Sequence, residues 1–577
     1  MAEKLTNEQQ AAVDSRERSL LVSAAAGSGK TKVLVERLFS YVEREGANLD
    51  DFLIITYTRA AASELRGKIA KALTERMERD PGNYHLRQQM LRVYRADIKT
   101  VDAFCTALLR ENCHLLGEDA RGHALRPDFR VLDENEAQVL RERVLARTLD
   151  DFYDCLTTGS TLLADTLGAG RDDSALEDLV LELHAKLQAQ PYEDKWLEAQ
   201  RAFWRAVPDK IENTPYGKIL LNEVRRKARH CKNLLQRAAQ EMCANDALNQ
   251  KYAPAFLDAS YQLEALEGKT AEGWDAARGV TIAFPRLAAV KDSDGGEMKA
   301  RMKSLWDNCK ETVKGFAEIF SASSDEAVED LRTMAPAMLA LIDLTADFSR
   351  RYNEEKRRRN SADFSDQEHE AIRLLIGEDG APTELARIVS ARYREIMVDE
   401  YQDTNEVQNR IFDAISCKGE NLFTVGDVKQ SIYRFRLADP RIFLQHYNTW
   451  PPLEDAEEHD SAKLLLSRNF RSRKEVLDAT NFIFCNILSE EMGELDYGAD
   501  EMLRLGANYV ESSACGAEFH LLDLPTQTGE QRVRASEAEA AFVADYISDM
   551  LTSEFPIQDD KTKELRPVRE EDIVILM

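Results

Sequence analysis

The sequence predicts an α/β fold in which a parallel sheet is divided by a large helical insertion. Short apolar runs lie beside turn residues at 20–22, 52–58, 396–398 and 422–425, as expected for buried parallel strands between helices. Between about 106 and 385 the pattern changes to long, charged, amphipathic helices with few strand signals. A helical insertion therefore separates two parts of one core.

A loop of small residues follows the first apolar run. Its residues are Ala24, Ala25, Ala26, Gly27, Ser28, Gly29, Lys30 and Thr31. Helical spacing of apolar residues begins directly after it, at Val33. A strand, a small-residue turn and a helix start offer backbone N–H groups to phosphate oxygens, with Lys30 for the β- and γ-phosphates and the Thr31 hydroxyl for Mg²⁺. Ala24 stands where such loops usually have their first glycine, and it keeps the turn small.

Two carboxylates follow the apolar run at 396–398. Asp399 can hold Mg²⁺ and Glu400 can polarise an attacking water, as nucleoside triphosphate hydrolysis requires. An acidic pair after an apolar run is, on its own, as often a solvated loop, but the phosphate-binding loop upstream favours the hydrolytic interpretation. Together the two motifs indicate a motor ATPase.

The inserted region and the last part of the chain have their own patterns. Asp133 followed by Glu136 is a helix-capping pair. One apolar face continues along the helix after it, at Leu140, Val144, Leu145, Leu149 and Phe152. Strand-like runs return at 463–466, 518–522 and 573–576. They predict a second α/β unit that begins after the acidic, proline-containing stretch at 450–460.

Length and composition are those of a folded protein with several domains. The chain has 577 residues, which is long for one core, and 44% of them are hydrophobic. The N-terminus has no apolar signal region, and no run of about 18 apolar residues occurs, so we expect a soluble, cytoplasmic protein without a membrane span. Nine cysteines without a CxxC pair favour a reducing compartment. No zinc or iron–sulfur site is evident among them and the scattered histidines.

The net charge of −27 does not exclude nucleic acid as a ligand. Net charge governs solubility and long-range steering, whereas a strand channel needs only a local basic lining and aromatic surfaces for base stacking. The basic runs 225–229 and 356–359 could contact duplex phosphates, but such runs in an acidic protein are more often solvated helix faces. The charge does argue against a protein that coats DNA by bulk electrostatics.

With these motifs in this order, the chain resembles the superfamily 1 DNA helicases of the UvrD/Rep type, and most closely the AddA helicase–nuclease subunits of bacterial AddAB complexes. The acidic run 399–403 resembles motif II, and 5–9 resembles the Q motif. Residues 56–65 and 100–105 resemble two contacts with single-stranded DNA, although Asp102 stands where many relatives have histidine. The resemblance implies that the α/β core is a RecA-like P-loop NTPase domain.

Two later segments carry the resemblance further. Residues 425–436 resemble motif III, in which Gln430 would sense the γ-phosphate. Residues 466–472 resemble motif IV, in which the Phe470 ring, replacing a more frequent tyrosine, would stack on adenine. Arg471 would reach the γ-phosphate as an arginine finger supplied within the chain.

The resemblance also implies a set of ligand contacts. The catalytic residues would be Lys30, Asp399, Glu400, Gln430 and Arg471. ATP would be bound by Gln9 at the adenine edge, residues 24–31, Phe470 and Arg471, with Thr31 and Asp399 on Mg²⁺. The DNA contacts would be Tyr57, Thr58, Arg59, Thr100, Phe104, Tyr433, Phe435 and Arg436. Tyr433 and Phe435 would stack on bases, whereas Tyr57 and Phe104 could equally be core aromatics. Gln402 and Asp403 would link hydrolysis to motif III and to the second domain.

The implied function is an ATP-dependent helicase that travels 3′→5′ on single-stranded DNA in the recombinational repair of double-strand breaks. Its expected partners are single- and double-stranded DNA, including DNA ends, and an AddB-like subunit in a heterodimer. The long insertion and the segments 127–133 and 363–369 favour AddA. A RecB-like or UvrD/Rep-like repair helicase, and a non-motor module that binds DNA ends and keeps a relic ATP site, stay open as alternatives.

Four segments follow from this resemblance. Residues 1–105 and 386–450 would be the two parts of the first RecA-like domain, 106–385 the helical insertion, and 451–577 the start of a second RecA-like domain. No segment resembles helicase motifs V and VI or the C-terminal RecB-like nuclease domain of AddA. We therefore expect an N-terminal fragment without nuclease activity and with weak or no unwinding on its own.

Overall fold

The computed structural model describes residues 5–118, 121–167, 174–291, 296–416, 419–434, 437–490, 494–510, 516–524, 534–559 and 562–576. The chain forms two compact units, one from residues 1–131 and 362–577 and the other from residues 132–361. The helical unit is thus shorter at both ends than the expected 106–385. The difference arises because helices on either side of it belong to the first unit.

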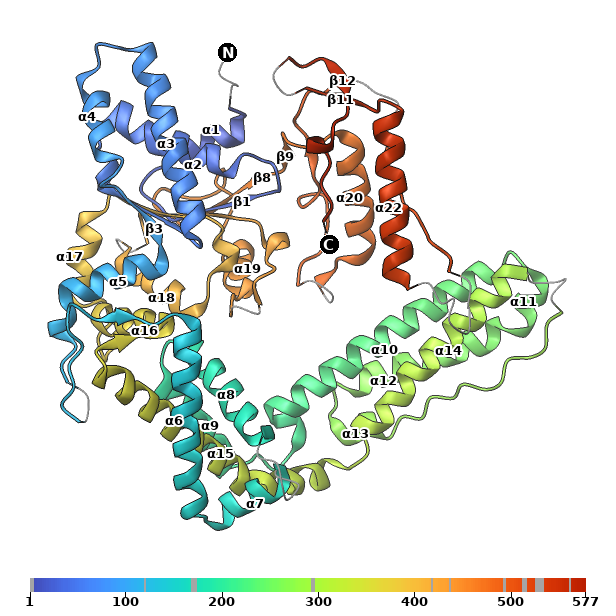
Figure 1. The fold of residues 1–577 in the computed structure, drawn as a ribbon. Helices are drawn as coiled ribbons and strands as arrows, with labels where there is room; N and C mark the ends of the chain where they lie inside the picture. Colours follow the sequence, from blue (N-terminus) through green and yellow to red (C-terminus); the bar gives the residue numbers. More distant parts are fainter. Residues whose placement is uncertain are drawn as a thin grey trace. The chain divides into compact units, whose positions relative to one another are not determined.

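A six-stranded sheet lies in the first unit (Figure 1). Its strands are β1 (Leu20–Ala24), β2 (Phe52–Thr56), β3 (Asp97–Thr100), β6 (Glu395–Val398), β7 (Leu422–Gly426) and β8 (Ala462–Leu466). They lie in the order β3-β2-β6-β7-β1-β8, and every neighbouring pair is parallel. Strands β1, β2, β6 and β7 are buried along their whole length, so the apolar runs that predicted them are confirmed as parallel strands.

Strand β8 belongs to this sheet and not to a second unit. It pairs with β1 from Leu20↔Ala462 to Ala24↔Leu466. The expectation that 463–466 opens a second domain is therefore wrong for this strand, because its backbone completes the free edge of β1, whose other edge is taken by β7. The expected boundary at 451 falls inside the first unit.

Helices and single helical turns connect these strands. The helices of the first unit are α1 (Asn7–Asp14), α2 (Lys30–Glu45), α3 (Arg59–Arg79), α4 (Tyr84–Arg92), α5 (Val101–Asn112), α16 (Phe364–Leu375), α17 (Glu384–Arg392), α18 (Glu406–Ile415), α19 (Pro440–Thr449), α20 (Lys474–Ile487) and α22 (Ala535–Thr552). The single turns are η1 (Leu49–Asp51), η2 (Cys113–Leu115), η5 (Tyr401–Asp403), η6 (Val428–Gln430) and η8 (Glu570–Asp572). Thr6, Thr58 and Thr100 cap α1, α3 and α5 through their hydroxyls, which fixes where these helices begin.

The second unit is helical, as the sequence predicted. Its helices are α6 (Glu134–Asp154), α7 (Thr158–Leu167), α8 (Ser174–Gln188), α9 (Glu193–Arg205), α10 (Pro215–Met242), α11 (Asp246–Lys251), α12 (Ala253–Lys269), α13 (Trp274–Arg278), α14 (Gly296–Ile319) and α15 (Ser324–Arg358), with a turn η3 (Ile211–Asn213). Asp133 caps α6 by accepting from the Glu136 backbone, which confirms the predicted capping pair. Phe256 of α12 stacks on Trp306 of α14 at 4.8 Å between ring centroids, within one apolar core.

The remaining strands are short. They are β4 (Arg130–Val131), β5 (Ser361–Ala362), β9 (Arg468–Asn469), β10 (Arg504–Leu505), β11 (Pro556–Gln558) and β12 (Leu565–Pro567). The strand-like runs at 518–522 and 573–576 are not strands in the described structure. Their side chains are largely exposed, with Phe519 89% and Leu521 82% accessible, so apolar sequence alone did not supply a pairing partner.

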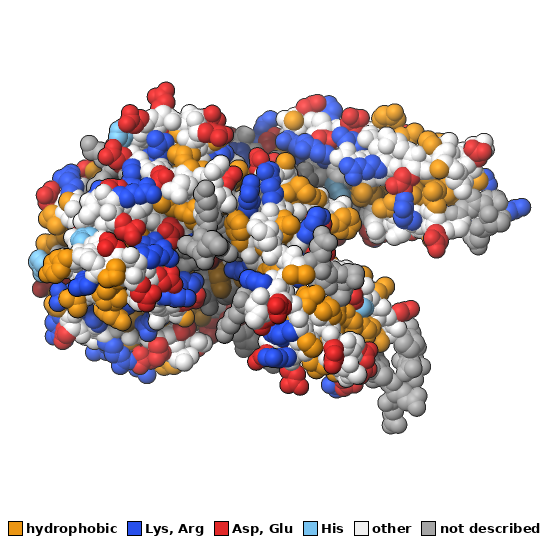
Figure 2. All heavy atoms as spheres, turned by 90° about the horizontal axis from the view of Figure 1, so that it is seen from above, with side chains coloured by type: hydrophobic (Ala, Val, Ile, Leu, Met, Phe, Trp, Pro, Cys, Tyr) orange, Lys and Arg blue, Asp and Glu red, His pale blue; other side chains and the backbone are white. Residues whose placement is uncertain are grey.

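Charged side chains of both signs are interspersed over the surface. In the run 225–229, Arg226 and Lys227 pair with Glu223, and Arg229 pairs with Glu267. In the run 356–359, Arg358 and Arg359 pair with Glu355, whereas Lys356 is only 1% exposed. Figure 2 shows the same mixture of Lys and Arg with Asp and Glu on the face in view. The pairing favours solvated helix faces for these paired side chains. No helix in the described part of the chain is long and apolar enough to cross a membrane.

A buried ion pair fixes α2 on the sheet. The Arg37 guanidinium, fully buried, donates to both carboxylate oxygens of Glu395 at the start of β6, and it also donates to the Ala12 carbonyl. The Tyr41 hydroxyl donates to the same carboxylate at 3.0 Å. Burial alone would lower the pKa of Arg37, but Glu395 outweighs it and raises that pKa, so the guanidinium keeps its charge. Because α2 begins at Lys30, this pair also holds the loop that precedes the helix.

We expect Arg37→Met to destabilise the protein strongly, because it leaves the Glu395 carboxylate buried without its cation. Removing one partner of a buried pair costs about 3–5 kcal/mol. Chemical unfolding monitored by circular dichroism measures the change. The double variant Arg37→Met with Glu395→Met is the control, because replacing both charges by apolar side chains should restore much of the loss. Equal stability of Arg37→Met and the parent would contradict the prediction.

Candidate nucleotide site

The loop between β1 and α2 has the backbone that a phosphate-binding turn requires. Gly27 and Gly29 both lie in the left-handed region, with φ of 69° and 85°. A Cβ at Gly27 would also meet the Asn469 side chain at 2.7 Å, so only glycine fits there. The Ser28 hydroxyl is buried and has no hydrogen-bond partner among the described residues. Such an unsatisfied group at a helix N-terminus fits an anionic oxygen.

Lys30 and Glu400 are 370 residues apart in sequence. They meet at the edge of the sheet where the parallel strands β1 and β6 end. The Lys30 Nζ lies 2.6 Å from Glu400 Oε2, and its side chain is only 12% exposed. Glu400 follows β6 with φ of 52°, a left-handed conformation that is unusual for a non-glycine residue. The structure thus brings together the lysine and the carboxylate that the sequence singled out, and holds the carboxylate in a strained backbone position.

Two further carboxylates lie close to this pair. Asp399 is anchored through its backbone N–H, which donates to the Ile55 carbonyl at 3.0 Å. Burial and the neighbouring Glu400 charge raise the pKa of Asp399 to about 6, and they do the same for Asp403. One Asp403 oxygen is buried without a hydrogen-bond partner among the described residues. Negative charge is therefore in excess around a single lysine, an arrangement that suits a cation.

No group of three His, Cys, Asp or Glu side chains that could hold a metal occurs among the described residues. Thr31 is the second residue of α2. A magnesium ion bound through Thr31 and Asp399 would therefore need its remaining ligands from water and phosphate oxygens, which is the usual coordination of Mg²⁺ in nucleotide enzymes. The donor set present fits that ion.

Gln402 connects Glu400 to the segment 425–436, which resembles motif III. Its amide nitrogen donates to Glu400 Oε2 at 3.0 Å, and its amide oxygen accepts from the Asp427 backbone N–H at 2.9 Å. Gly426 leaves room for this amide, because a Cβ there would lie 2.4 Å from the Gln402 oxygen. Asp427 in turn accepts from the Gln430 side chain at 2.8 Å. Gln402 thus bridges the acidic run and the segment that resembles motif III, while its coupling to hydrolysis and the part of Asp403 stay predictions.

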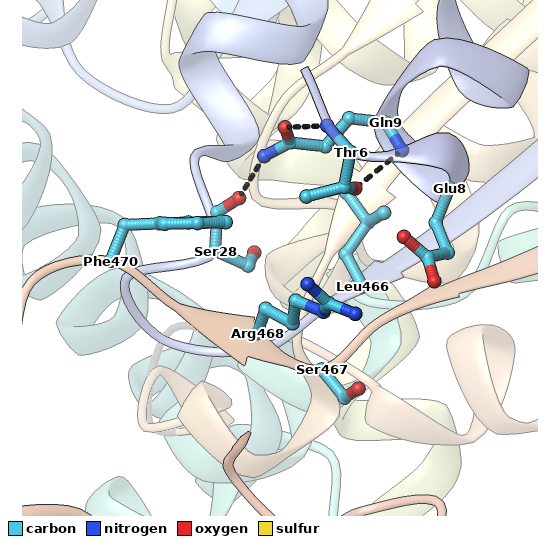
Figure 3. A pocket seen from close by; sticks show the side chains of 8 residues that line it. All are labelled: Thr6, Glu8, Gln9, Ser28, Leu466, Ser467, Arg468 and Phe470. Carbon is cyan, nitrogen blue, oxygen red and sulfur yellow. Dashed lines mark hydrogen bonds between the residues drawn. The ribbon is translucent and has the colours of Figure 1, made fainter. Parts of the chain in front are cut away.

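A small pocket lies on the other side of the phosphate-binding loop (Figure 3). It is lined by Thr6, Glu8, Gln9, Ser28, Leu466, Ser467, Arg468 and Phe470. Gln9 is 3% exposed and donates to the Ser28 carbonyl at 2.9 Å, while its amide oxygen accepts from the Thr6 backbone. Figure 3 shows the Phe470 ring extending toward Ser28. The structure thus brings the predicted adenine-reading residues together beside the loop.

Asn469 holds this pocket together, and sequence reasoning missed its role. Its side-chain amide donates to the Ala26 carbonyl at 2.7 Å and its oxygen accepts from the backbone of Arg471 and Ser472. The next residue, Phe470, donates its backbone N–H to the Gly27 carbonyl at 2.8 Å. A polar residue that directly precedes the predicted stacking ring was the available signal. The Arg471 side chain itself is exposed.

The ring of Phe470 is partly exposed at the pocket. Gly506 lies against it so closely that a Cβ would meet the ring at 2.7 Å. Phe470 is nevertheless 37% exposed. A flat apolar ring that is packed in part and accessible in part is suited to stack on a planar base.

The predicted DNA contacts have different environments. Thr58 and Arg59 are exposed at the start of α3, and Tyr57 and Tyr433 are half-buried, with the Tyr57 hydroxyl bonded to Thr404. Phe435 and Arg436 lie outside the described residues. Phe104 is only 4% exposed, so the structure favours the core aromatic of the two interpretations that the sequence left open for this ring. Thr100 is also buried and its hydroxyl caps α5.

Asp102 faces a second buried carboxylate, Glu368 of α16. Glu368 accepts from the Gln408 amide at 2.7 Å and from Asn405 at 3.5 Å. Burial, together with the Asp102 charge, raises the pKa of Glu368 to about 7. Burial also raises the pKa of Asp102, although Arg59 opposes that shift. Sequence reasoning noted the segment 363–369 only as a family resemblance and did not identify this pair.

We expect the stability conferred by Glu368 to depend on pH. Its folded pKa of about 7 lies above the ordinary value of 4.5, so the folded protein holds the proton more tightly. Stability should therefore fall as pH rises from about 4.5 to about 7, by on the order of 1–3 kcal/mol. Glu368→Gln removes this loss and should raise the unfolding midpoint at pH 8 but not at pH 5. Differential scanning fluorimetry at both values measures it, with the exposed Glu378→Gln as a control that should show no such difference. An equal effect at both pH values would contradict the assignment.

Comparison with known proteins agrees with this geometry. A family model described as the UvrD/REP helicase N-terminal domain matches residues 5–451. The chain is 34% identical to the AddA subunit of the ATP-dependent helicase/nuclease of Ruminiclostridium cellulolyticum, over 100% of this chain and 49% of the relative. It is 35% identical to that of Alkaliphilus oremlandii and 33% to that of Listeria innocua, in each case over 99% of this chain and 47% of the relative.

The resemblance to the AddA helicase–nuclease subunits that the motifs carried is therefore confirmed over the whole chain. The chain spans about half the length of the curated relatives it matches. By the match over residues 5–451, it belongs to the UvrD/REP helicase family.

Proposed function

We propose that this chain contains the ATP-driven motor of a DNA helicase in a helicase–nuclease of the AddA type. In this proposal the parallel sheet is the core of a RecA-like domain, and the part of the chain after β8 begins a second one. The contact that carries the proposal is the 2.6 Å ion pair between Lys30 and Glu400. It joins the phosphate-binding loop to the acidic motif at the carboxyl edge of one parallel sheet, where nucleotide sites form in such folds.

The nucleotide would be held at both ends by the residues described above. Backbone N–H groups of residues 26, 27 and 29–31 and the Ser28 hydroxyl bind phosphate oxygens, whereas the N–H groups of Ala25 and Ser28 donate to carbonyls within the protein. Within the protein the Gln9 side-chain amide donates one hydrogen bond and accepts one. Its second N–H and the second lone pair of its oxygen are therefore left for the adenine edge. Phe470 stacks on the base with its accessible ring surface.

Lys30 and Glu400 divide the work of hydrolysis. Lys30 neutralises Glu400 in the structure described, and it turns to the more strongly charged β- and γ-phosphates when nucleotide enters. Glu400 is then released to orient and deprotonate the attacking water. Mg²⁺, held with the nucleotide by Thr31 and Asp399, would offset the charge that develops on the phosphates. Arg471, which is exposed, is the arginine finger of this proposal.

The carboxylates proposed for hydrolysis and the proposed DNA contacts follow neighbouring strands of the sheet. Thr58 and Arg59 follow β2, and Gln430 and Tyr433 follow β7, while β6 with its carboxylates lies between these two strands. A change at Glu400 therefore reaches motif III through Gln402. We propose that repeated binding and hydrolysis moves single-stranded DNA 3′→5′ past these contacts by about one base per ATP. DNA ends and an AddB-like subunit are the proposed partners, and double-strand break repair is the proposed role.

We expect Lys30→Ala to abolish nucleotide binding and Glu400→Gln to preserve it while lowering kcat. Loss of a positioned general base reduces the rate by about 10²–10⁴-fold. Binding of a fluorescent ATP analogue and phosphate release with and without oligo(dT) measure the two effects. Glu406→Gln is the matched control, because this carboxylate lies six residues further on and pairs only with Arg410 among the described contacts.

Undiminished DNA-stimulated ATPase in both variants would overturn the proposed function. Nucleotide binding by the parent without any hydrolysis, in the presence or absence of oligo(dT), would instead favour the alternative of a non-motor DNA-end-binding module with a relic ATP site.

Phe470→Ala should raise the KM for ATP without a comparable change in kcat. Stacking of a base on an aromatic ring contributes about 1–3 kcal/mol, so a rise of about fivefold to a hundredfold is expected. Phe470→Tyr keeps the ring and should keep the KM. The exposed Phe482→Ala is the control for loss of a surface aromatic. An unchanged KM in Phe470→Ala would exclude base stacking at this position.

A further inference from the structure

A buried ion-pair cluster joins motif III to the segment that follows α20. The Lys429 Nζ lies 2.8 Å from Asp427 Oδ1 and 2.6 Å from Glu501 Oε2. The three side chains are 11%, 2% and 6% exposed, and the Tyr447 hydroxyl donates to the other Glu501 oxygen. The nucleotide contacts proposed above use neither Lys429 nor Glu501.

The buried Lys429 amine at the centre of this cluster keeps its charge. Burial lowers the pKa of Lys429, but Asp427 and Glu501 outweigh it, so the pKa is raised and the amine keeps its charge. A buried ion pair contributes little net stability compared with apolar packing, and its best-attested use is to select one arrangement over competing ones. The use of this cluster is therefore to be found in how the two segments that it joins, motif III and the segment after α20, are arranged.

On one side, hydrogen bonds connect the cluster to the residues at the phosphate end of the proposed nucleotide site. Asp427 accepts from the Gln430 amide through its second carboxylate oxygen, and its backbone N–H donates to Gln402. Gln402 in turn holds Glu400. A displacement of Gln430 or Glu400 by a γ-phosphate therefore changes the groups that surround Asp427.

On the other side the cluster leads to the base end. Three residues after Glu501 the chain enters β10, which bonds in parallel with β9. The Gly506 N–H donates to the Asn469 carbonyl at 2.8 Å. Gly506 also packs on the Phe470 ring. The segment 497–506 is also held on α20, because Asn481 of that helix bonds to the Tyr497 hydroxyl and to both backbone groups of Leu503.

We propose that Lys429 and Glu501 are positioning residues that couple the γ-phosphate sensor Gln430 to Phe470, which directly follows β9, so that the phosphate end and the base end of the nucleotide site change together. This inference rests on the proposed ATPase function. The inference differs from the ATPase proposal in one respect: it requires a path of coupling through segment 497–506, which has no proposed contact with phosphate.

Hydrogen–deuterium exchange of the 577-residue chain tests this path without requiring catalysis. With Mg²⁺ and a non-hydrolysable ATP analogue, exchange should slow in the phosphate-binding loop and also, by about threefold or more, in segment 497–506. ADP should protect the loop but not the segment. In Glu501→Gln the loop should keep its protection and the segment should lose it, because the glutamine keeps an acceptor for Tyr447 but not the charge.

Glu494→Gln is the matched control. Glu494 pairs with Arg434 at 2.6 Å and so joins the same two parts of the chain, but both side chains are largely exposed, 40% and 59%. Exposed pairs contribute little, so this variant should behave as the parent does. DNA stimulation of kcat is the second readout, and we expect it to fall about tenfold in Glu501→Gln with the KM for ATP nearly unchanged. Lys429→Met, with the same outcome, would confirm the pair.

The outcomes separate the two proposals. If nucleotide protects the loop and segment 497–506 equally in the parent and in Glu501→Gln, the coupling path is overturned while the ATPase proposal stands. If Glu494→Gln loses protection as much as Glu501→Gln, a general loosening of the segment is responsible and the path is again overturned. If no nucleotide protects the loop in the parent, the ATPase proposal and this inference fall together.

Discussion

The parallel direction of the six strands is the constraint on which the candidate site depends. Because every strand runs the same way, the loops after β1, β6 and β7 meet at one edge, and Lys30 reaches Glu400 across 370 residues of sequence. An antiparallel strand would carry its loop to the opposite edge. The long insertion leaves this geometry intact because the chain leaves the first unit after β3 and returns before β6. Arg37, bound to Glu395, then sets how α2 lies against that edge.

Local patterns predicted the parts of the molecule that local chemistry determines. The four apolar strands, the phosphate-binding loop and the Asp133 cap depend on turn residues, hydrophobic periodicity and capping within a few residues of each other. The site pair at Lys30 and Glu400 was predictable because both belong to motifs with a fixed chemistry. Such residues could be assigned before any long-range contact was known.

Long-range packing decided the rest. The run at 463–466 was recognised as a strand, but its sheet could not be inferred, since pairing with β1 is not written in its own residues. Phe104 has the position of a DNA contact and yet is buried, because its exposure depends on helices that lie far away in sequence. Asn469, Glu368 and Glu501 are single polar residues whose partners come from other elements, and no spacing rule identifies them.

Charge gives the strongest reason to regard this site as incomplete without a ligand. Asp399, Glu400 and Asp403 surround one lysine, and burial of two of them raises their pKa values to about 6. Glu400 adds the strain of a left-handed backbone, which persists only where the surrounding structure imposes it. A nucleotide phosphate would take over Lys30 and leave the carboxylates with still less compensation. Phosphate binding alone would thus be unfavourable at this edge, and in the proposed function a divalent cation that enters with the nucleotide would supply the missing positive charge.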